Sequence, residues 1–409
     1  MALYRLDSPI RAYAWGSHTT LADLQGRPAP TAEPEAELWM GAHPTAPSVL
    51  ADDGRRTLLD LITSAPATAL GPGRGQLPFL LKVLAVEHPL SLQVHPDAEQ
   101  AAAGHAAEEA AGVSPDDPHR SYHDDQPKPE LLCALTPFTA LCGFADPAQS
   151  AELLDSLDVS ALSDVTAHLR AGDLRAAVTA LLTWPRAERK RVIAEVRSAC
   201  SRRTGLRATW AARLAQAYPD DMGVVTSMLL NLLELAPGEA LYVPGRTLHA
   251  YLHGTGIEIM AASDNVLRGG LTPKHIDLPE LLAVTDFSPT QPDTIRPVAT
   301  GDHGKTYPTP APQFRLTSYR TGPDATVTLR HPGPDIVLCL QGEITIRRDD
   351  TVATLPPGHA AFLPRTGGPA ELSGPGLAYH ATPGATDPDR QPLALSRADS
   401  QLARAPRPA

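Results

Sequence analysis

Residues 235–244 read LAPGEALYVP, and residues 355–364 read LPPGHAAFLP with the same spacing. In each decapeptide a Pro-Gly turn precedes a short apolar run, and a second proline ends that run. A turn, a strand and a stop at fixed offsets are typical of antiparallel β-proteins. Because the pattern occurs twice, the sequence predicts two related β-barrels.

The two copies differ in the residues downstream of them. His249 lies twelve residues after Pro237, whereas Pro369 lies twelve residues after Pro357. An imidazole can bind a metal and a proline cannot, so only the first barrel is predicted to carry a metal ligand at this place. We therefore interpret the second barrel as scaffold.

Further apolar runs surround the first copy. They predict strands at residues 79–86, 91–95, 131–135, 229–235, 239–243, 249–252 and 257–260. The last two strands are expected to be joined by a turn at Gly254–Thr255–Gly256. Beyond residue 312, strands are predicted at residues 314–319, 325–330, 336–340, 343–347 and 360–363, and the alanine-rich residues 98–111 predict a helix.

The region from residue 148 to 217 has a different pattern. Its leucines recur at helical spacing, and Gly172 and Pro185 divide it into three or four expected helices. The fold class predicted is therefore mainly β with an inserted α-helical domain. Residues 1–147 and 223–286 are expected to form the two parts of the first barrel, residues 148–222 the helical insert, and residues 287–409 the second barrel, with a loose tail after about residue 384.

Composition excludes several classes of partner. The 409-residue chain has a net charge of −11 and no basic tract, so neither nucleic acid nor an anionic membrane is an expected partner. No signal-peptide pattern and no 18-residue apolar run is present. Four scattered cysteines form neither a disulfide framework nor a CxxC pair, which fits a reducing cytoplasm.

Four residues from separate β stretches are candidate metal ligands. Gln93 and His95 are two apart on a predicted strand and so face the same way, while Glu130 opens another strand directly after a proline. With His249 they make a set of two nitrogen and two oxygen donors, which suits Zn²⁺, although Mn²⁺, Fe²⁺ and Co²⁺ also fit. His253 or His88 could replace one of the histidines, and the alternative is polar strand residues that face water.

Lysine is rare in this chain, which has 30 Arg and five Lys. A lysine that remains can mark a place where a compact ammonium is needed and a planar guanidinium does not serve, although retention by chance is the alternative. Three of the five, Lys82, Lys128 and Lys274, lie in sequence motifs around the candidate ligands, and Glu258 and Arg268 also lie around this set. Several cations and a carboxylate beside a metal suit a phosphorylated sugar, whose carbonyl the metal would polarise while a base moves a proton between carbons.

A set of motifs then identifies a family. They are YAWG (13–16), ELWMG (37–41), PFLLKVL (78–84), SLQVHPD (91–97), KPE (128–130), HAYL (249–252) and ASDNVLRGGLTPK (262–274). In this order and over most of the first 280 residues, the chain resembles the type I phosphomannose isomerases, which are zinc-dependent cupins. The resemblance implies two cupin (jelly-roll) barrels and the interconversion of mannose 6-phosphate and fructose 6-phosphate through a cis-enediol.

The resemblance also implies roles for individual residues. It assigns one zinc ion per chain to Gln93, His95, Glu130 and His249. It places Ser91, Lys82 and Lys274 on the substrate and gives catalytic roles to Arg268, Glu258 and Lys128. Glu258 is chemically the better base, and Arg268 is better suited to stabilise an enediolate. A small sugar phosphate is the expected partner, and the chain is expected to act as a monomer.

Two departures from the family pattern keep alternatives open. The family usually has Asn-His before Lys-Pro-Glu, where this chain has Gln126–Pro127, and it usually has proline where this chain has Leu248. The change at Pro127 leaves a related sugar or sugar phosphate possible as the substrate. A non-catalytic sugar-binding cupin is the remaining hypothesis, and the full set of metal ligands argues against it.

Overall fold

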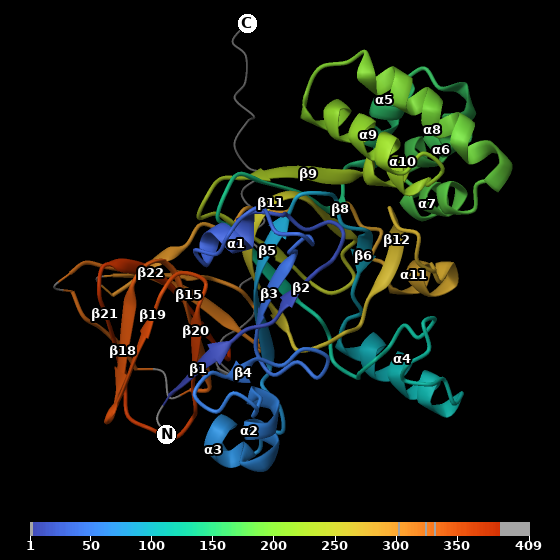
Figure 1. Ribbon diagram of the computed structural model, residues 1–409. Helices are drawn as coiled ribbons and strands as arrows, with labels where there is room; N and C mark the ends of the chain where they lie inside the picture. Colours follow the sequence, from blue (N-terminus) through green and yellow to red (C-terminus); the bar gives the residue numbers. More distant parts are fainter. Residues whose placement is uncertain (1–2, 302, 324, 331–332, 385–409) are drawn as a thin grey trace, which may run out of the picture.

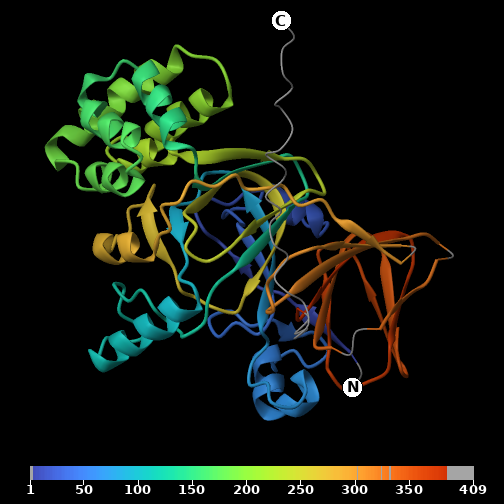
Figure 2. The same cartoon turned by 180° about the vertical axis from the view of Figure 1, so that it is seen from behind.

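The structure is a computed structural model that describes residues 3–301, 303–323, 325–330 and 333–384. Antiparallel sheets make up its middle and one end, and most of its helices gather at the other end (Figure 1). Figure 2 shows the same arrangement from behind, with the C-terminal strands on the side away from the helices. The predicted loose tail lies outside the described residues.

Two blocks of strands have the same arrangement, and the strands at the same place in the two blocks are equivalent. The first block runs β2-β3-β5-β11-β7-β10 and the second runs β13-β14-β15-β22-β17-β20, and every neighbouring pair is antiparallel. The first block consists of β2 (Ile10–Arg11), β3 (Glu37–Met40), β5 (Phe79–Val86), β7 (Glu130–Ala134), β10 (Ala240–Val243) and β11 (His249–Ala261). The second consists of β13 (Val298–Thr300), β14 (Gly304–Tyr307), β15 (Arg315–Thr321), β17 (Asp335–Gly342), β20 (Ala360–Leu363) and β22 (Gly376–Thr382).

The sequence repeat coincides with this shared order. Its two apolar runs form β10 and β20, which occupy the same place in their blocks. Val243 pairs with Glu130, and the equivalent Leu363 pairs with Asp335. The repeat therefore marks two related strand arrangements. Both sheets have open strand orders, so what is observed is a mainly antiparallel β fold.

Other strands complete the β structure. β12 (Leu267–Gly270), β6 (Leu92–Val94), β8 (Phe138–Phe144) and β9 (Leu230–Leu235) join the first block through β11. β1 (Tyr4–Asp7) and β4 (Val49–Leu50) extend the second block beyond β20. A separate sheet consists of β16 (Val327–Leu329), β21 (Ala370–Ser373), β18 (Ile344–Arg348) and β19 (Thr351–Leu355).

β11 is one strand of 13 residues, so the predicted turn at Gly254–Thr255–Gly256 is wrong. The first half of β11 pairs with β6 and β8, and the second half pairs with β5 and β7. A register shift near His253 marks the change, and Gly254 has a φ of 126°. A side chain at Gly254 would lie 2.7 Å from Phe138, so the glycine permits a bend and a close approach within the strand.

Helices lie mainly between β8 and β9. Five α-helices and a 3₁₀ turn occupy residues 147–217, so the expectation of three or four helices for this region was too low. One unforeseen break follows α5, where Asp158 adopts a φ of 55°. The helices are α5 (Pro147–Ser156), η1 (Ser160–Leu162), α6 (Ser163–Arg170), α7 (Leu174–Leu182), α8 (Arg186–Ser201) and α9 (Leu206–Ala217). The other helices are α1 (Thr20–Leu24), α2 (Leu58–Ser64), α3 (Pro66–Leu70), α4 (Ala98–Ala110), α10 (Gly223–Ser227) and α11 (Leu278–Val284).

Apolar packing joins these parts. One core lies between the two blocks, where Leu81 and Ile257 of the first share a buried cluster with Leu316 and Ile336 of the second. A second core fills the opposite side of the first block, and a third joins the helices to β6, β8 and β9. Burial on both faces holds the first block rigidly, as a site built on its strands requires.

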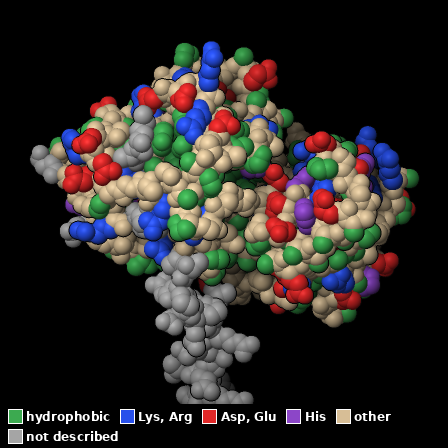
Figure 3. Space-filling model, turned by 90° about the horizontal axis from the view of Figure 1, so that it is seen from below, with side chains coloured by type: hydrophobic (Ala, Val, Ile, Leu, Met, Phe, Trp, Pro, Cys, Tyr) green, Lys and Arg blue, Asp and Glu red, His purple; other side chains and the backbone are tan. Residues whose placement is uncertain are grey.

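One face of the molecule carries charges of both signs. Lys and Arg side chains are interspersed with Asp and Glu side chains over the face drawn in Figure 3. Within the described part of the chain, no helix has the length and apolar character needed to cross a membrane.

Candidate metal centre

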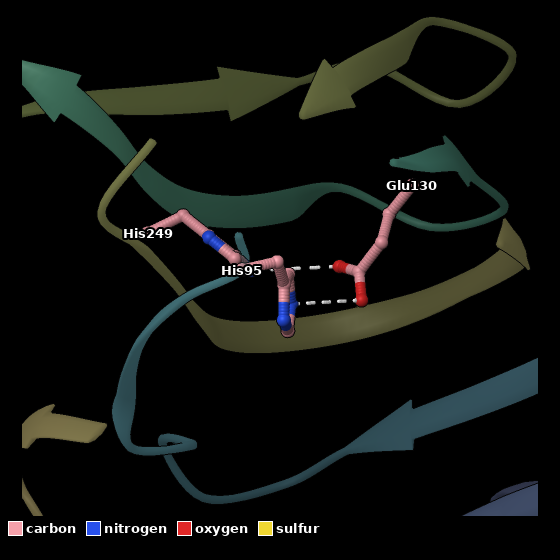
Figure 4. Close-up of side chains that lie close together, drawn as sticks. All are labelled: His95, Glu130 and His249. Carbon is pink, nitrogen blue, oxygen red and sulfur yellow. Dashed lines mark ion pairs between the residues drawn. The ribbon is translucent and has the colours of Figure 1, made fainter. Parts of the chain in front are cut away.

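Three predicted ligands meet in the first block. His95 follows β6, while Glu130 and His249 are the first residues of β7 and β11. Nε2 of His95 lies 3.1 Å from one Glu130 oxygen, and Nε2 of His249 lies 3.4 Å from the other (Figure 4). All three side chains are buried, and their ligand atoms lie within 4.8 Å of one another. Segments far apart in sequence thus aim two nitrogens and a carboxylate at one point.

Strand pairing and a tight loop hold the histidines in place. His249 pairs with Gln93 across β11 and β6. The backbone N–H of Arg246 donates a 2.6 Å hydrogen bond to the carbonyl of His95. A Cβ at Gly245 would lie 3.0 Å from the carbonyl oxygen of Pro96, so glycine lets this loop approach closely.

Backbone carbonyls fix which imidazole nitrogen is available. Nδ1 of His95 lies 2.7 Å from the carbonyl of Asn265, and Nδ1 of His249 lies 2.9 Å from that of Thr247. A carbonyl can only accept, so each Nδ1 carries the proton and each Nε2 presents its lone pair. Burial, helped by the charge of Lys128, lowers the pKa of His95 to about 4, which favours the neutral form that binds metals.

The arrangement fits a divalent metal. Nε2 of His95 is buried and makes no hydrogen bond among the described residues, despite the nearby Glu130 oxygen. A metal ion between the two groups would satisfy both. The fourth predicted ligand, Gln93, lies in the same cavity, and its Nε2 donates to Ser91 Oγ at 3.2 Å. That hydrogen bond leaves the amide oxygen of Gln93 available as a donor atom.

Two further groups face Glu130. The hydroxyl of Tyr251 donates to one carboxylate oxygen at 3.4 Å, and Nζ of Lys128 lies 3.4 Å from the other. Burial alone would raise the pKa of Glu130, but the facing imidazoles and the Lys128 ammonium outweigh it and hold that pKa well below its usual range. Glu130 is therefore ionised, as a metal ligand must be.

A cavity of about 540 Å³ adjoins these residues. Nine of the ten residues predicted for the site line it, and the tenth, His95, lies 3.1 Å from Glu130. The nine are Lys82, Ser91, Gln93, Lys128, Glu130, His249, Glu258, Arg268 and Lys274. Of the alternative ligands, His88 lines the cavity but lies outside the metal-binding group of the described residues, and His253 is exposed.

A buried set of charges occupies one wall of the cavity. Nζ of Lys82 lies 2.9 Å from Glu258 and 3.4 Å from Glu37. Burial opposes the charge on Lys82, but the surrounding carboxylates outweigh it and raise the pKa of the ammonium. Burial also raises the pKa of Glu258, and Lys82 works against that rise. Lys82 thus lies buried in the wall of this cavity.

Two further cations, Arg268 and Lys274, line the cavity. Arg268 belongs to β12 and pairs with Gln93 of β6, which places it next to the predicted metal position. Burial lowers the pKa of Arg268, and burial together with Arg268 lowers that of Lys274. Lys274 is mostly exposed at the cavity rim, where a charged group of a ligand could reach it.

Sequence reasoning missed some residues of this site. Glu37 and Tyr251 belong to the quoted motifs, but no role was predicted for either. His43 also lines the cavity, and its Nε2 lies 3.0 Å from a carboxylate oxygen of Asp264. An acidic residue two positions before a tryptophan is a weak signal, so only the fold reveals that Glu37 faces Lys82.

Asn265 connects several parts of the site. Its side-chain oxygen accepts hydrogen bonds from the backbone of His123 and Asp124, and its side-chain nitrogen donates to the carbonyls of Asp124 and Gln126. The loop with the unusual Gln126–Pro127 is therefore tied to the residue that orients His95. Leu248, the other departure from the family pattern, is buried in the core beside the helices.

Comparisons with known proteins agree with this geometry. Residues 3–146 match the family described as phosphomannose isomerase type I, catalytic domain. The chain is 37% identical to the mannose-6-phosphate isomerase of Salmonella typhimurium over 386 residues, which is 91% of this chain and 98% of that protein. It is 31% identical to the human mannose-6-phosphate isomerase over 396 residues, covering 87% and 91% of the two chains.

Solved structures of the same enzyme superpose on this fold. A mannose 6-phosphate isomerase bound with zinc and yttrium aligns with a TM-score of 0.87 and 35% identity, over 94% of this chain and 100% of that one. The Salmonella typhimurium enzyme bound to fructose 6-phosphate and zinc aligns with a TM-score of 0.87 and 36% identity over the same shares. With this identity over nearly the whole length, the chain belongs to the type I phosphomannose isomerase family.

Proposed function

We propose that this chain is a zinc-dependent aldose–ketose isomerase that interconverts mannose 6-phosphate and fructose 6-phosphate through a cis-enediol. The observation that carries the proposal is the convergence of His95, Glu130 and His249 beside a cavity that also contains a buried base and several cations. Relatives similar over nearly the whole chain carry this enzyme's name, and one solved relative holds zinc and fructose 6-phosphate.

The metal would be held by Gln93, His95, Glu130 and His249. Bound zinc supplies a Lewis acid that polarises a sugar oxygen and acidifies the neighbouring C–H group. The two imidazoles and the carboxylate are already oriented by backbone carbonyls, Tyr251 and Lys128. Such preorganisation means that little of the site must rearrange when the ion binds.

Glu258 is the proposed base. It is buried, and burial raises its pKa towards the range in which a carboxylate both accepts and returns a proton. Lys82, at 2.9 Å, orients this carboxylate and favours its ionised form. A single carboxylate beside two adjacent carbons can remove a proton from one and deliver it to the other.

The cations divide into two roles in this proposal. Arg268 and Lys128 stabilise the negative charge that develops on the enediolate oxygens. Lys274 at the rim binds the phosphate, and Ser91 and Lys82 position the sugar. A guanidinium remains protonated, so Arg268 is not assigned a proton-transfer step.

A coupled assay for fructose 6-phosphate formed from mannose 6-phosphate tests the function. Activity should disappear after dialysis against a chelator and return with one equivalent of zinc per chain. Turnover of another sugar or sugar phosphate, but not of mannose 6-phosphate, would indicate a different substrate. No turnover by the zinc-loaded protein would indicate a sugar-binding protein and not an enzyme.

We further propose two cupin barrels with the predicted boundaries. Residues 1–147 and 223–286 would form the catalytic barrel, apart from β1 and β4, which extend the sheet of the second block. Residues 148–222 would form the helical insert, and residues 287–409 the second barrel and the C-terminal tail. The equal strand order of the two blocks supports this organisation. The proposal includes a monomer in the cytoplasm, and the unpaired state of all four buried cysteines supports a reducing compartment.

A further inference from the structure

A second cavity of about 560 Å³ lies between the two blocks, and we call it the inter-block cavity. From the first block it is lined by Ala134 at the end of β7 and by the turn before β10. From the second block it is lined by residues of β14, β15, β17 and β22, including Lys305, Arg320 and Tyr379. Glu130 opens β7 and Ala134 ends it, so the metal centre and this cavity lie about 13 Å apart along one strand.

Strand register shows that the cations belong to the inward face of the second block. Lys305 pairs with Ser318, and Tyr307 pairs with Leu316, so these side chains share one face of the sheet. Tyr307 and Leu316 on that face are buried in the core between the blocks. Lys305 and Arg320 therefore continue a packed face to the point where it opens into the cavity.

The charge in this cavity is unbalanced. The one acidic lining residue, Glu239, is already engaged, because it lies 3.3 Å from Arg296 and accepts a hydrogen bond from the backbone of Ala236. Among the described residues, the side chains of Lys305 and Arg320 have no ion-pair or hydrogen-bond partner. Two cations without partners in a hollow of a protein with net charge −11 indicate an anionic ligand.

The sequence supplies a separate argument for Lys305. The chain has 30 Arg and only five Lys, and three of those five lysines line the metal cavity. Of the remaining two, Lys190 lies exposed on α8 and Lys305 lines the inter-block cavity. A compact ammonium beside a planar guanidinium is a pairing suited to a phosphate group.

The floor of the cavity suits an organic body. Tyr307 and Tyr379 lie there, with their hydroxyls 3.0 and 3.6 Å from the thiol of buried Cys133, and Leu340 and Leu377 add apolar surface. Cavities of this size at the junction of two structural units are common places for small ligands. An apolar floor with a cationic rim distinguishes a phosphate ester from free phosphate.

We propose that the inter-block cavity binds a small phosphate ester, with its phosphate between Lys305 and Arg320 and its organic part against Tyr379 and Leu377. This site is separate from the metal cavity, with which it shares none of its lining residues. It gives the second block, interpreted from sequence as scaffold, a binding role of its own.

Competitive lysine labelling tests the site with an internal control. The zinc-loaded protein is treated with a limiting amine acylating reagent, and modification of Lys305 and Lys190 is followed by mass spectrometry. Fructose 6-phosphate and adenosine 5′-monophosphate serve as ester probes, against inorganic phosphate and sodium chloride at equal ionic strength. At about ten times its dissociation constant, a bound ester should slow labelling of Lys305 about tenfold and leave Lys190 unchanged.

The outcomes decide the proposal. Protection of Lys305 by an ester but not by chloride supports it. Equal protection by inorganic phosphate would reduce the cavity to an inorganic-anion site and overturn the assignment of an ester. Equal protection by sodium chloride, or no protection by any probe, would also overturn it.

Calorimetry with variants gives an independent readout. The ester that protects Lys305 should lose at least about tenfold in affinity for the inter-block cavity in a Lys305→Gln, Arg320→Gln double variant. Isomerase activity should persist, which also shows that the variant is folded. The single variant Lys305→Gln serves if the double variant does not fold, and Lys190→Gln is the matched control. Unchanged affinity in the double or single variant would contradict the site.

Discussion

The two β blocks place different side chains at equivalent strand positions. Glu130 pairs with Val243 in the first copy of the sequence repeat, and Asp335 pairs with the equivalent Leu363 in the second copy. Glu258 lies opposite Leu132 and Lys82, just as His380 lies opposite Val337 and Thr317. In the second block His380 and Asp335 form a buried pair 3.2 Å apart. In the first block the residues at these two positions, Glu258 and Glu130, line a cavity.

The difference shows what a metal centre adds to a shared strand frame. The frame provides Glu130, Glu258 and Lys82, whereas His95 follows β6, outside the frame, and His249 begins the half of β11 that pairs with β6 and β8. Twelve residues after Pro357, at the spacing of His249 from Pro237, the second copy has Pro369, which lies just before β21 and outside the second block. In that block the polar side chains His380 and Asp335 pair with each other and remain buried. Variants at equivalent positions can therefore separate catalytic from structural roles.

The largest difference between variants is expected at Glu130 and Asp335, whose strands pair with the two copies of the sequence repeat. Glu130→Gln should lower zinc affinity by at least about 100-fold and abolish isomerase activity, because an amide cannot supply the anionic ligand. Asp335→Asn should keep zinc and activity and lower the free energy of unfolding by about 1–3 kcal/mol. Metal analysis after dialysis, activity assays and thermal unfolding measure these effects. Loss of zinc from Asp335→Asn would contradict the separation of roles.

The next effect concerns the base. Glu258→Gln should lower kcat by about 10²–10⁴-fold while the protein keeps its zinc, because an amide cannot accept the proton. His380→Gln changes the equivalent position of the second block and should leave kcat unchanged. Steady-state kinetics on both zinc-loaded variants compare them, and near-normal turnover by Glu258→Gln would remove this residue from proton transfer.

A smaller effect is expected at the cavity rim. Lys274→Gln should raise KM for mannose 6-phosphate about tenfold or more with a smaller change in kcat, because it removes a charge-assisted contact to the phosphate. Lys190→Gln, which changes an exposed lysine on α8, should alter neither constant. If KM does not change in Lys274→Gln, the phosphate is bound elsewhere.

The smallest effect is a shift in pH dependence. Burial raises the pKa of Glu258 and Lys82 opposes the rise, so removal of the ammonium in Lys82→Met should raise that pKa further. The base acts as a carboxylate, so activity falls as pH falls through its pKa. The acidic limb of kcat/KM should therefore move to higher pH. Thr317→Val, at the equivalent position of the second block, should not move it.

A limb that stays in place in Lys82→Met, or that moves to lower pH, would contradict the assignment of Glu258. Zinc content is measured across the same pH range in this experiment. Retained zinc at each pH shows that the limb does not report loss of the metal.

Much of the candidate site was predictable because its ligands lie in short motifs with a fixed strand period. Gln93 and His95 are two residues apart, and Glu130 directly follows a proline, which made them candidates, and the family resemblance then assigned the set. The contact of Glu37 with Lys82 depends on the pairing of β3 with β5, which sequence spacing does not reveal. The same holds for the carbonyl of Asn265, whose role comes from its backbone and not from its side-chain type.

The fold was predicted less evenly. The strand of residues 360–363 was predicted with the observed bounds because proline and glycine delimit it. The turn predicted at Gly254–Thr255–Gly256 was wrong because glycine serves two purposes, and here it permits close packing against Phe138 within one long strand. Helix breaks such as that at Asp158 depend on single backbone angles that leucine spacing does not encode.

Diffraction from crystals of the zinc-loaded protein, measured on both sides of the zinc absorption edge, tests the central claim most directly. The account predicts one anomalous peak per chain, bonded at about 2.0–2.2 Å to Gln93, His95, Glu130 and His249. A peak elsewhere, for example beside His380 and Asp335 in the second block, or no peak in protein that is active without metal, would contradict it.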